Sequence, residues 1–189
     1  MSKINQGGIP MKQEINVFDY AGHICTSMKK GILVTAKVGD KVNPMTIGWG
    51  TIGIEWGKPI FVTYIRVGRH TRQMLDETGE FTVNIPYGDI DSKILSYCGT
   101  KSGRDTDKVA DLGLELVDSS VVNVPGIRQL PLTLECKVLC RSVQNIPMLP
   151  DEILNRYYPQ GVDSSNSGSN EDFHIAYYGQ IVNAYLITD

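Results

Sequence analysis

Apolar and β-branched residues recur along the chain in short runs that predict strands rather than long helices. The clearest run is 131–141, where Leu132 and Leu134 fall on one face and Thr133 and Glu135 on the other. Similar runs, bounded by glycine, proline or charged residues, lie at 31–38, 59–66, 80–85, 114–117 and 173–187, the last bent at Gly179. The chain is therefore predicted to be mainly β.

The segment from Met45 to Trp56 mixes threonine, isoleucine and tryptophan with glycines at 48, 50 and 53. Glycine at this density disfavours a helix, so we expect one bent strand that opens after Asn43-Pro44.

Helical patterns are short and end at glycine. They predict helices at 71–77, 91–97 and 105–112, which stop at Gly79, Gly99 and Gly113, and a fourth helix at 151–157. Thr71 is expected to cap the first helix, and Asp105 or Thr106 the third. Many strands with short helices between them favour a closed or nearly closed antiparallel barrel with helical insertions.

The chain has 189 residues, which predicts a single domain over 1–189. Residues 1–14 are polar and glycine-rich and are expected to form a loose extension. The stretch 162–170 is rich in Asp, Ser, Asn and Gly and is expected to be a loop.

Composition narrows the class of protein. The net charge of -3 lacks the basic excess of a nucleic-acid binder, and no stretch is long enough to span a membrane. The chain starts without the pattern of a signal peptide, so a cytoplasmic protein is expected. The four cysteines form no CxxC pair and the three histidines show no zinc spacing, which predicts free, buried thiols and no metal site.

Two stretches in the first half of the chain indicate ligand binding. In 43–52, glycines allow a flat ligand to approach the backbone, although a glycine-bent strand explains the pattern equally well. The stretch 66–72 carries three arginines and opens a helix, whose free N–H groups attract phosphate; a solvated basic turn is the alternative.

Two further stretches add weaker signals. The stretch 98–108 supplies Ser102, Gly103 and Lys108 but lacks the spacing of a Walker A loop. His174 opens an otherwise apolar strand, where it either packs as a structural side chain or meets a bound ring system as a hydrogen-bond donor.

Five stretches follow one another along the chain in this order: NPMTIGWG, PIFVTYIRVGRHT, EFTVNIP, SGRDTDKVADLGL and FHIAYYGQIV. Together they resemble the flavin reductase-like family, the FMN-binding split-barrel group that includes flavoredoxins. The resemblance covers roughly Gly31 to Ile187. It implies a six-stranded antiparallel Greek-key split barrel with short flanking helices. It also implies a homodimer, with FMN at or near the subunit interface.

The resemblance also implies roles by position. It places the segment from Met45 to Trp49 along the flavin, a basic group near the phosphate, and Asn84 at a turn that shapes the pocket. The expected cofactor-binding residues are Met45, Thr46, Ile47, Gly48, Trp49, Arg66, Arg69, His70, Thr71, Asn84, Ser102, Gly103, Lys108 and His174. Gly48 and Gln180 depart from the serine or alanine and the glutamate of many relatives.

The leading hypothesis is an oxidoreductase that passes hydride or electrons through non-covalently bound FMN, with no catalytic acid or base from the chain. The electron source is then NAD(P)H, another small molecule or a redox protein. The alternative is a non-enzymatic barrel that stores or senses FMN. A hydrolase is disfavoured because the chain lacks a GxSxG elbow.

Overall fold

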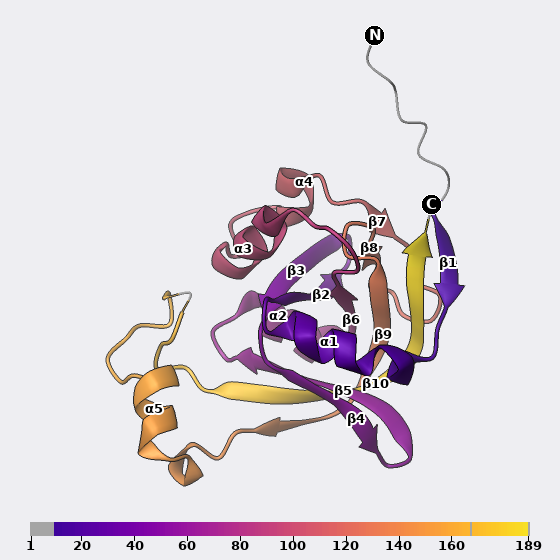
Figure 1. The fold of residues 1–189 in the computed structure, drawn as a ribbon. Coiled ribbons are helices and arrows are strands. Elements are labelled where there is room, and N and C mark those ends of the chain that lie inside the picture. The colour runs from indigo at the N-terminus through magenta and orange to yellow at the C-terminus, as the bar shows by residue number, and fades with distance from the viewer. Residues whose placement is uncertain (1–9, 167, 189) are drawn as a thin grey trace.

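The structure, a computed structural model, describes residues 10–166 and 168–188. Its main element is one antiparallel sheet of eight strands in the order β3-β2-β6-β9-β10-β5-β4, with β1 added against β10 (Figure 1). These strands are β1 (Met11–Glu14), β2 (Ile32–Val38), β3 (Lys41–Ile47), β4 (Gly50–Glu55), β5 (Lys58–Arg66), β6 (Glu80–Ile85), β9 (Leu132–Val143) and β10 (His174–Thr188). A separate pair joins β7 (Leu116–Val117) to β8 (Gly126–Ile127).

Short helices fill the connections between strands. They are η1 (Val17–Tyr20), α1 (Ala21–Met28), α2 (His70–Thr78), α3 (Ser92–Thr100), α4 (Lys108–Leu112), η2 (Ile146–Met148) and α5 (Asp151–Tyr157). Helix α2 packs against β2, β3 and β5, while α3 and α4 pack against β3. Helix α5 and the loop after it lie beside the barrel, at the far end of the β9–β10 ribbon from β1 (Figure 1). None of the described helices has the length and apolar character needed to cross a membrane.

The barrel is split between β3 and β4. These two strands are consecutive in the chain, yet they stand at opposite ends of the sheet order and do not pair with each other. The expected single strand over Met45 to Trp56 is therefore wrong, because the chain breaks at Gly48 and Trp49 to pass from one end strand to the other. The mainly β split-barrel fold is confirmed, with eight strands in the main sheet rather than six.

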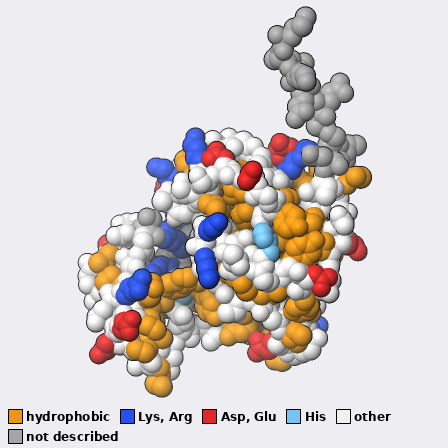
Figure 2. Space-filling model, in the orientation of Figure 1, with side chains coloured by type: hydrophobic (Ala, Val, Ile, Leu, Met, Phe, Trp, Pro, Cys, Tyr) orange, Lys and Arg blue, Asp and Glu red, His pale blue; other side chains and the backbone are white. Residues whose placement is uncertain are grey.

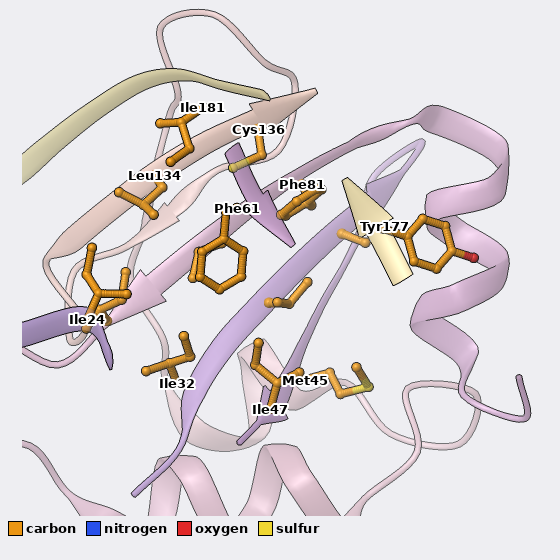
Figure 3. Packing of buried hydrophobic residues seen from close by; sticks show 14 of the residues in the cluster. Ile24, Ile32, Met45, Ile47, Phe61, Phe81, Leu134, Cys136, Tyr177 and Ile181 are labelled. Atoms are coloured by element: carbon orange, nitrogen blue, oxygen red, sulfur yellow. The ribbon is translucent and has the colours of Figure 1, made fainter. Parts of the chain in front are cut away.

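Apolar side chains from α1 and from several strands point into the barrel and form its core (Figure 3). Two glycines make this packing possible. A Cβ on Gly50 would lie 2.9 Å from Met28 Sδ and 3.0 Å from Phe61 Cζ, and a Cβ on Gly179 would collide with the ring of Phe81. The register of β10 against β9 shifts between Tyr178 and Gly179, which is where the sequence predicted a bend.

Local differences from the predicted elements concern helix starts and the N-terminal segment. Thr71 lies inside α2 rather than at its cap, and Asp107 caps α4 through the amides of Val109 and Ala110. Helix α3 continues through Gly99 to Thr100. Residues 11–14 pair with the end of β10, while the rest of the expected loose extension, 1–9, lies outside the described residues.

The cysteines are free, as expected, but only two of them are buried. Cys98 and Cys136 lie in the interior, whereas Cys25 and Cys140 are exposed. Within 10–166 and 168–188, no group of three or more His, Cys, Asp or Glu side chains is arranged to hold a metal ion.

Candidate functional site

A cavity of about 310 Å³ opens where the chain leaves β3. Its floor is the end of β3 with Gly48 and Trp49, and its sides come from β5, the end of α5 and the start of β10. The predicted residues that line it are Met45, Thr46, Ile47, Gly48, Trp49, Arg66, Arg69 and His174. The lining is completed by Tyr64, Ile65, Tyr157, Gly168 and Ser169. We call this cavity the ring end.

The ring end is bordered by an end strand of the sheet. Because β3 pairs only with β2, its other edge has no neighbouring strand to take its amide and carbonyl groups. Met45 and Ile47 point into the core, and Thr46 points the other way and donates to the carbonyl of Leu95 at 2.6 Å. What β3 offers a ligand is therefore mainly its backbone edge.

A smaller and more polar cavity of about 120 Å³ adjoins the first. It is lined by the start of α2, the end of α3 and the loop that follows (98–104), Lys108, and two serines, Ser164 and Ser165. The predicted residues here are Arg69, His70, Thr71, Ser102, Gly103 and Lys108. Met45 and Arg69 line both cavities, so the two form one groove. We call the smaller cavity the phosphate end. Figure 2 shows Lys and Arg side chains around the hollow between the α5 segment and the barrel.

Aromatic rings cluster at the ring end. The ring of Trp49 lies 4.7 Å from that of His174 and 5.1 Å from that of Tyr157, measured between centroids. The ring of Tyr158 stands edge-on to His174 at 5.6 Å. These rings come from the β3–β4 connection, α5 and β10, so they bring three distant segments together at one wall.

His174 is held by a chain of two hydrogen bonds. The Tyr158 hydroxyl donates to Gln144 Oε1 at 2.6 Å and lies 2.8 Å from His174 Nδ1. With the Gln144 amide oriented so that Oε1 faces Tyr158, the hydroxyl can only accept from His174, and we infer that Nδ1 carries the proton and Nε2 is an acceptor. Burial, with Arg66 and Arg69 nearby, lowers the pKa of His174 to about 3. The histidine is therefore neutral, and in this tautomer it accepts a hydrogen bond rather than donating one as the sequence suggested.

Arg66 is buried and binds the protein itself. Its guanidinium donates to the carbonyls of Tyr157 at 2.8 Å and Asp172 at 2.5 Å, and more weakly to Asn170. Burial lowers the pKa of Arg66, although an arginine stays charged. Arg66 thus links the end of α5 and the start of β10 to β5. Its positive charge lies at the groove, but both of its terminal nitrogens already donate to carbonyl groups of the protein.

The loop that carries Ser164 and Ser169 lies against the groove. Asp172 accepts hydrogen bonds from the amide of Gly68 at 3.1 Å and from the hydroxyl of Ser164 at 2.8 Å. These bonds hold the loop against the start of α2, where Ser164 lines the phosphate end and Ser169 the ring end.

Lys108 lies buried beside the phosphate end. Its ammonium donates to the carbonyl of Pro44 on the free edge of β3 at 2.9 Å and to that of Cys98 at 3.1 Å. Burial lowers its pKa to about 8. The lysine therefore anchors the 98–108 loop to β3 and remains a cation at neutral pH.

Three polar side chains complete the phosphate end. Asn43 donates to the Thr71 hydroxyl at 2.8 Å, and that hydroxyl in turn faces Met45 Sδ at 3.4 Å. Asn43 Oδ1 and His70 Nε2 are buried without a hydrogen-bond partner, which buried polar atoms seldom are. Such atoms on a cavity wall fit a site that a polar ligand completes.

Of the predicted site residues, only Asn84 lies elsewhere in the described structure. Phe81, Val83 and Ile85 of β6 face the barrel core, so the alternation of the strand places Asn84 on the opposite face of the sheet, where it is still fully buried. There its amide donates to Thr82 at 3.0 Å, and it lines neither cavity. The expectation of a turn at Asn84 is wrong, because β6 continues through Ile85.

The sequence reasoning missed other residues of the groove. Asn43 is the first residue of the motif NPMTIGWG but was not among the predicted site residues, although its position in that motif could have indicated a place in the groove. Tyr157, Tyr158 and Gln144 gave no signal, because they reach the groove only when α5 folds back beside β10.

Comparison with known proteins decides the family. The sequence profile described as the flavin reductase like domain matches residues 28–189. The chain belongs to the flavin reductase-like family. A protein of Archaeoglobus fulgidus, described as uncharacterized, is 33% identical over 100 residues, which are 53% of this chain and 55% of the relative. The match thus spans about half the length of that relative.

Solved structures share the fold of this flavin reductase-like chain. A flavoredoxin from Methanosarcina acetivorans aligns over 98% of this chain and 75% of its own, with a TM-score of 0.59 and 22% identity. The FMN-binding domain of a flavin reductase-like enzyme from Shewanella baltica aligns over 95% of this chain and 79% of its own, with a TM-score of 0.60 and 14% identity.

Proposed function

We propose that this flavin reductase-like protein binds FMN in the groove and works as an oxidoreductase. The observation that carries the proposal is the two-ended character of the groove. One end is wide and walled by aromatic rings and a free strand edge, and the adjoining end is narrow and polar with positive charge. A flat ring system joined to a phosphate has the same two ends.

At the phosphate end, Arg69 and Lys108 supply positive charge and the start of α2 supplies backbone N–H groups. Helix α2 has no side-chain cap on its first turn, so none of its N–H groups is taken by a capping side chain. The hydroxyls of Ser102 and Ser164 and the free Nε2 of His70 add polar contacts.

At the ring end, the edge of β3 offers amides and carbonyls to the polar side of a ring system, and Trp49 with Tyr157 limits access of water. The neutral His174 offers Nε2 as an acceptor. When bound there, FMN supplies the redox chemistry, accepting a hydride or electrons and passing them on.

The test is the visible spectrum of the purified full chain, before and after addition of FMN and then of NADH or NADPH. We expect flavin absorbance that stays with the protein through gel filtration, and bleaching with one donor. Bound flavin that neither nucleotide bleaches favours a carrier served by a redox protein, or a store. Failure to retain any FMN contradicts the proposal.

We also propose that the protein is a homodimer that pairs through the outer face of β4, β5 and β10. Trp56 is 57% exposed at the β4–β5 hairpin, and its ring lies 6.3 Å from that of Tyr178 on this face. The backbone of Trp56 has a φ of 51°, a conformation that bulky residues avoid. This exposed tryptophan therefore occupies a strained backbone position. An apolar surface of this kind fits a subunit contact.

A further inference from the structure

A third cavity lies directly beyond the phosphate end of the groove. It measures about 440 Å³ and runs along the start of β3 and the 103–107 loop. Val42, Val109 and Leu116 give it apolar walls. Its charged lining consists of the carboxylates Asp40, Asp105 and Asp107 and the cations Lys41 and Arg104. Apolar walls for a base and carboxylates for ribose hydroxyls are what a nucleoside needs. We call this space the outer cavity.

Asn43, Gly103 and Arg104 line both the phosphate end and the outer cavity, and the contact between Asn43 and Gly103 stands between the two. The contact is tight: a Cβ on Gly103 would collide with Asn43 Oδ1. Only glycine fits at 103 with Asn43 in place, and the Asn43 side chain blocks the way from one cavity to the other.

Both sides of this contact are fixed. Asn43 is 2% exposed and its amide is held by Thr71. The 102–106 turn is closed by bonds from the amides of Asp105 and Thr106 to the carbonyl of Ser102, at 3.1 and 3.2 Å. Lys108 then ties the loop to the carbonyl of Pro44, the residue next to Asn43. Neither side can move aside without breaking buried hydrogen bonds.

We propose that the contact between Asn43 and Gly103 is the stop that limits the groove to a flavin mononucleotide and excludes the adenosine half of FAD. The inference rests on the proposed function, because it specifies which flavin the same groove accepts. The outer cavity has room for an adenosine, but the stop keeps a pyrophosphate from crossing into it.

The test is titration of the flavin-free full chain with FMN and with FAD, followed by flavin fluorescence. We expect the wild type to bind FMN tighter than FAD by about tenfold or more. Asn43→Ser shortens the side chain, and we expect the ratio of the two affinities to fall toward one, with FAD binding gained as well as FMN binding weakened. Adding Leu116→Trp fills the outer cavity and should remove the gained FAD affinity while leaving that for FMN unchanged.

The outcomes separate the two proposals. If the wild type binds FAD as tightly as FMN, or Asn43→Ser leaves the ratio unchanged, the stop is contradicted while the FMN site stands. If Leu116→Trp fails to reverse the gain, adenosine does not use the outer cavity and the inference also fails. If neither flavin binds the wild type, both proposals fall.

Discussion

Lys108 is a buried cation that lines the phosphate end, so we expect the proposed binding of FMN to depend on pH. Its pKa of about 8 means that its charge is lost just above neutrality, whereas an ordinary lysine keeps its charge to above pH 10. A phosphate dianion favours the charged lysine, so the affinity for FMN is highest below the pKa of Lys108 and falls above it. A rise of one unit in this pKa on binding gives about a tenfold loss of affinity between pH 7 and 9.5.

Riboflavin provides the control for this prediction, because it shares the ring system but lacks the phosphate. Its affinity should vary less over the same range, and Lys108→Met should flatten the pH profile for FMN. The measurement is fluorescence titration at each pH. An FMN affinity that is constant from pH 7 to 9.5 in the wild type contradicts the assignment of Lys108 to the phosphate end.

Tyr158 acts on the groove through His174. Tyr158→Phe removes the hydroxyl that accepts from Nδ1 and leaves the buried Nδ1 of His174 and the half-buried amide oxygen of Gln144 without this partner. We expect a loss of about 1–3 kcal/mol in the free energy of unfolding. We also expect His174 to shift from the single Nδ1–H tautomer to a mixture of the two tautomers.

The measurement for Tyr158 is ¹⁵N NMR of the histidine ring, which distinguishes the tautomers. Tyr157→Phe is the matched control, because the neighbouring ring lines the cavity but its hydroxyl is not part of the hydrogen-bond chain to His174. A wild-type His174 that carries its proton on Nε2 would contradict the inferred directions of the hydrogen bonds from His174 to Tyr158 and from Tyr158 to Gln144.

At the scale of elements, β10 shows how one glycine shapes a strand. A methyl group at Gly179 collides with Phe81 and would lie 3.1 Å from Cys136 Cβ, in a core without room to relax. Gly179→Ala should therefore destabilise the protein by about 1–3 kcal/mol in chemical denaturation. Gly53→Ala on β4 is the control, since a Cβ there meets nothing within 4 Å, and its effect should stay within about 0.5 kcal/mol. Equal effects at the two glycines would show that packing against Phe81 is not the cause.

Elements with a strong local signal were predictable from the sequence. The bounds of β6 and α5 match the expected runs, because alternation and helical periodicity are properties of neighbouring residues. The break at Gly48 was missed because it depends on where β3 and β4 stand in the sheet order, which no local pattern encodes.

The same distinction holds for the candidate site. The sequence motifs identified the segments that form both ends of the groove. The role of each individual residue, however, depends on tertiary contacts that the motifs do not encode. Arg66 was expected at a phosphate, yet it binds the carbonyls of Tyr157 and Asp172, about a hundred residues away in sequence. Asn84 belonged to a matching motif, but strand alternation turned it away from the groove.

At the scale of the molecule, the uncovered face of β4, β5 and β10 predicts assembly. Trp56, whose ring lies beside that of Tyr178 on this face, is 57% exposed, more than an apolar residue of this size usually is. Light scattering should give the mass of a dimer for the wild type. The double variant Trp56→Glu with Tyr178→Glu should give that of a monomer with an unchanged circular dichroism spectrum, because burying unpaired charges in an apolar contact costs several kcal/mol. Val121→Glu, at an apolar residue that is 46% exposed outside β4, β5 and β10, should leave the dimer intact. A wild type that is monomeric at micromolar concentration, or a double variant that stays dimeric, would show that this face is not the subunit contact.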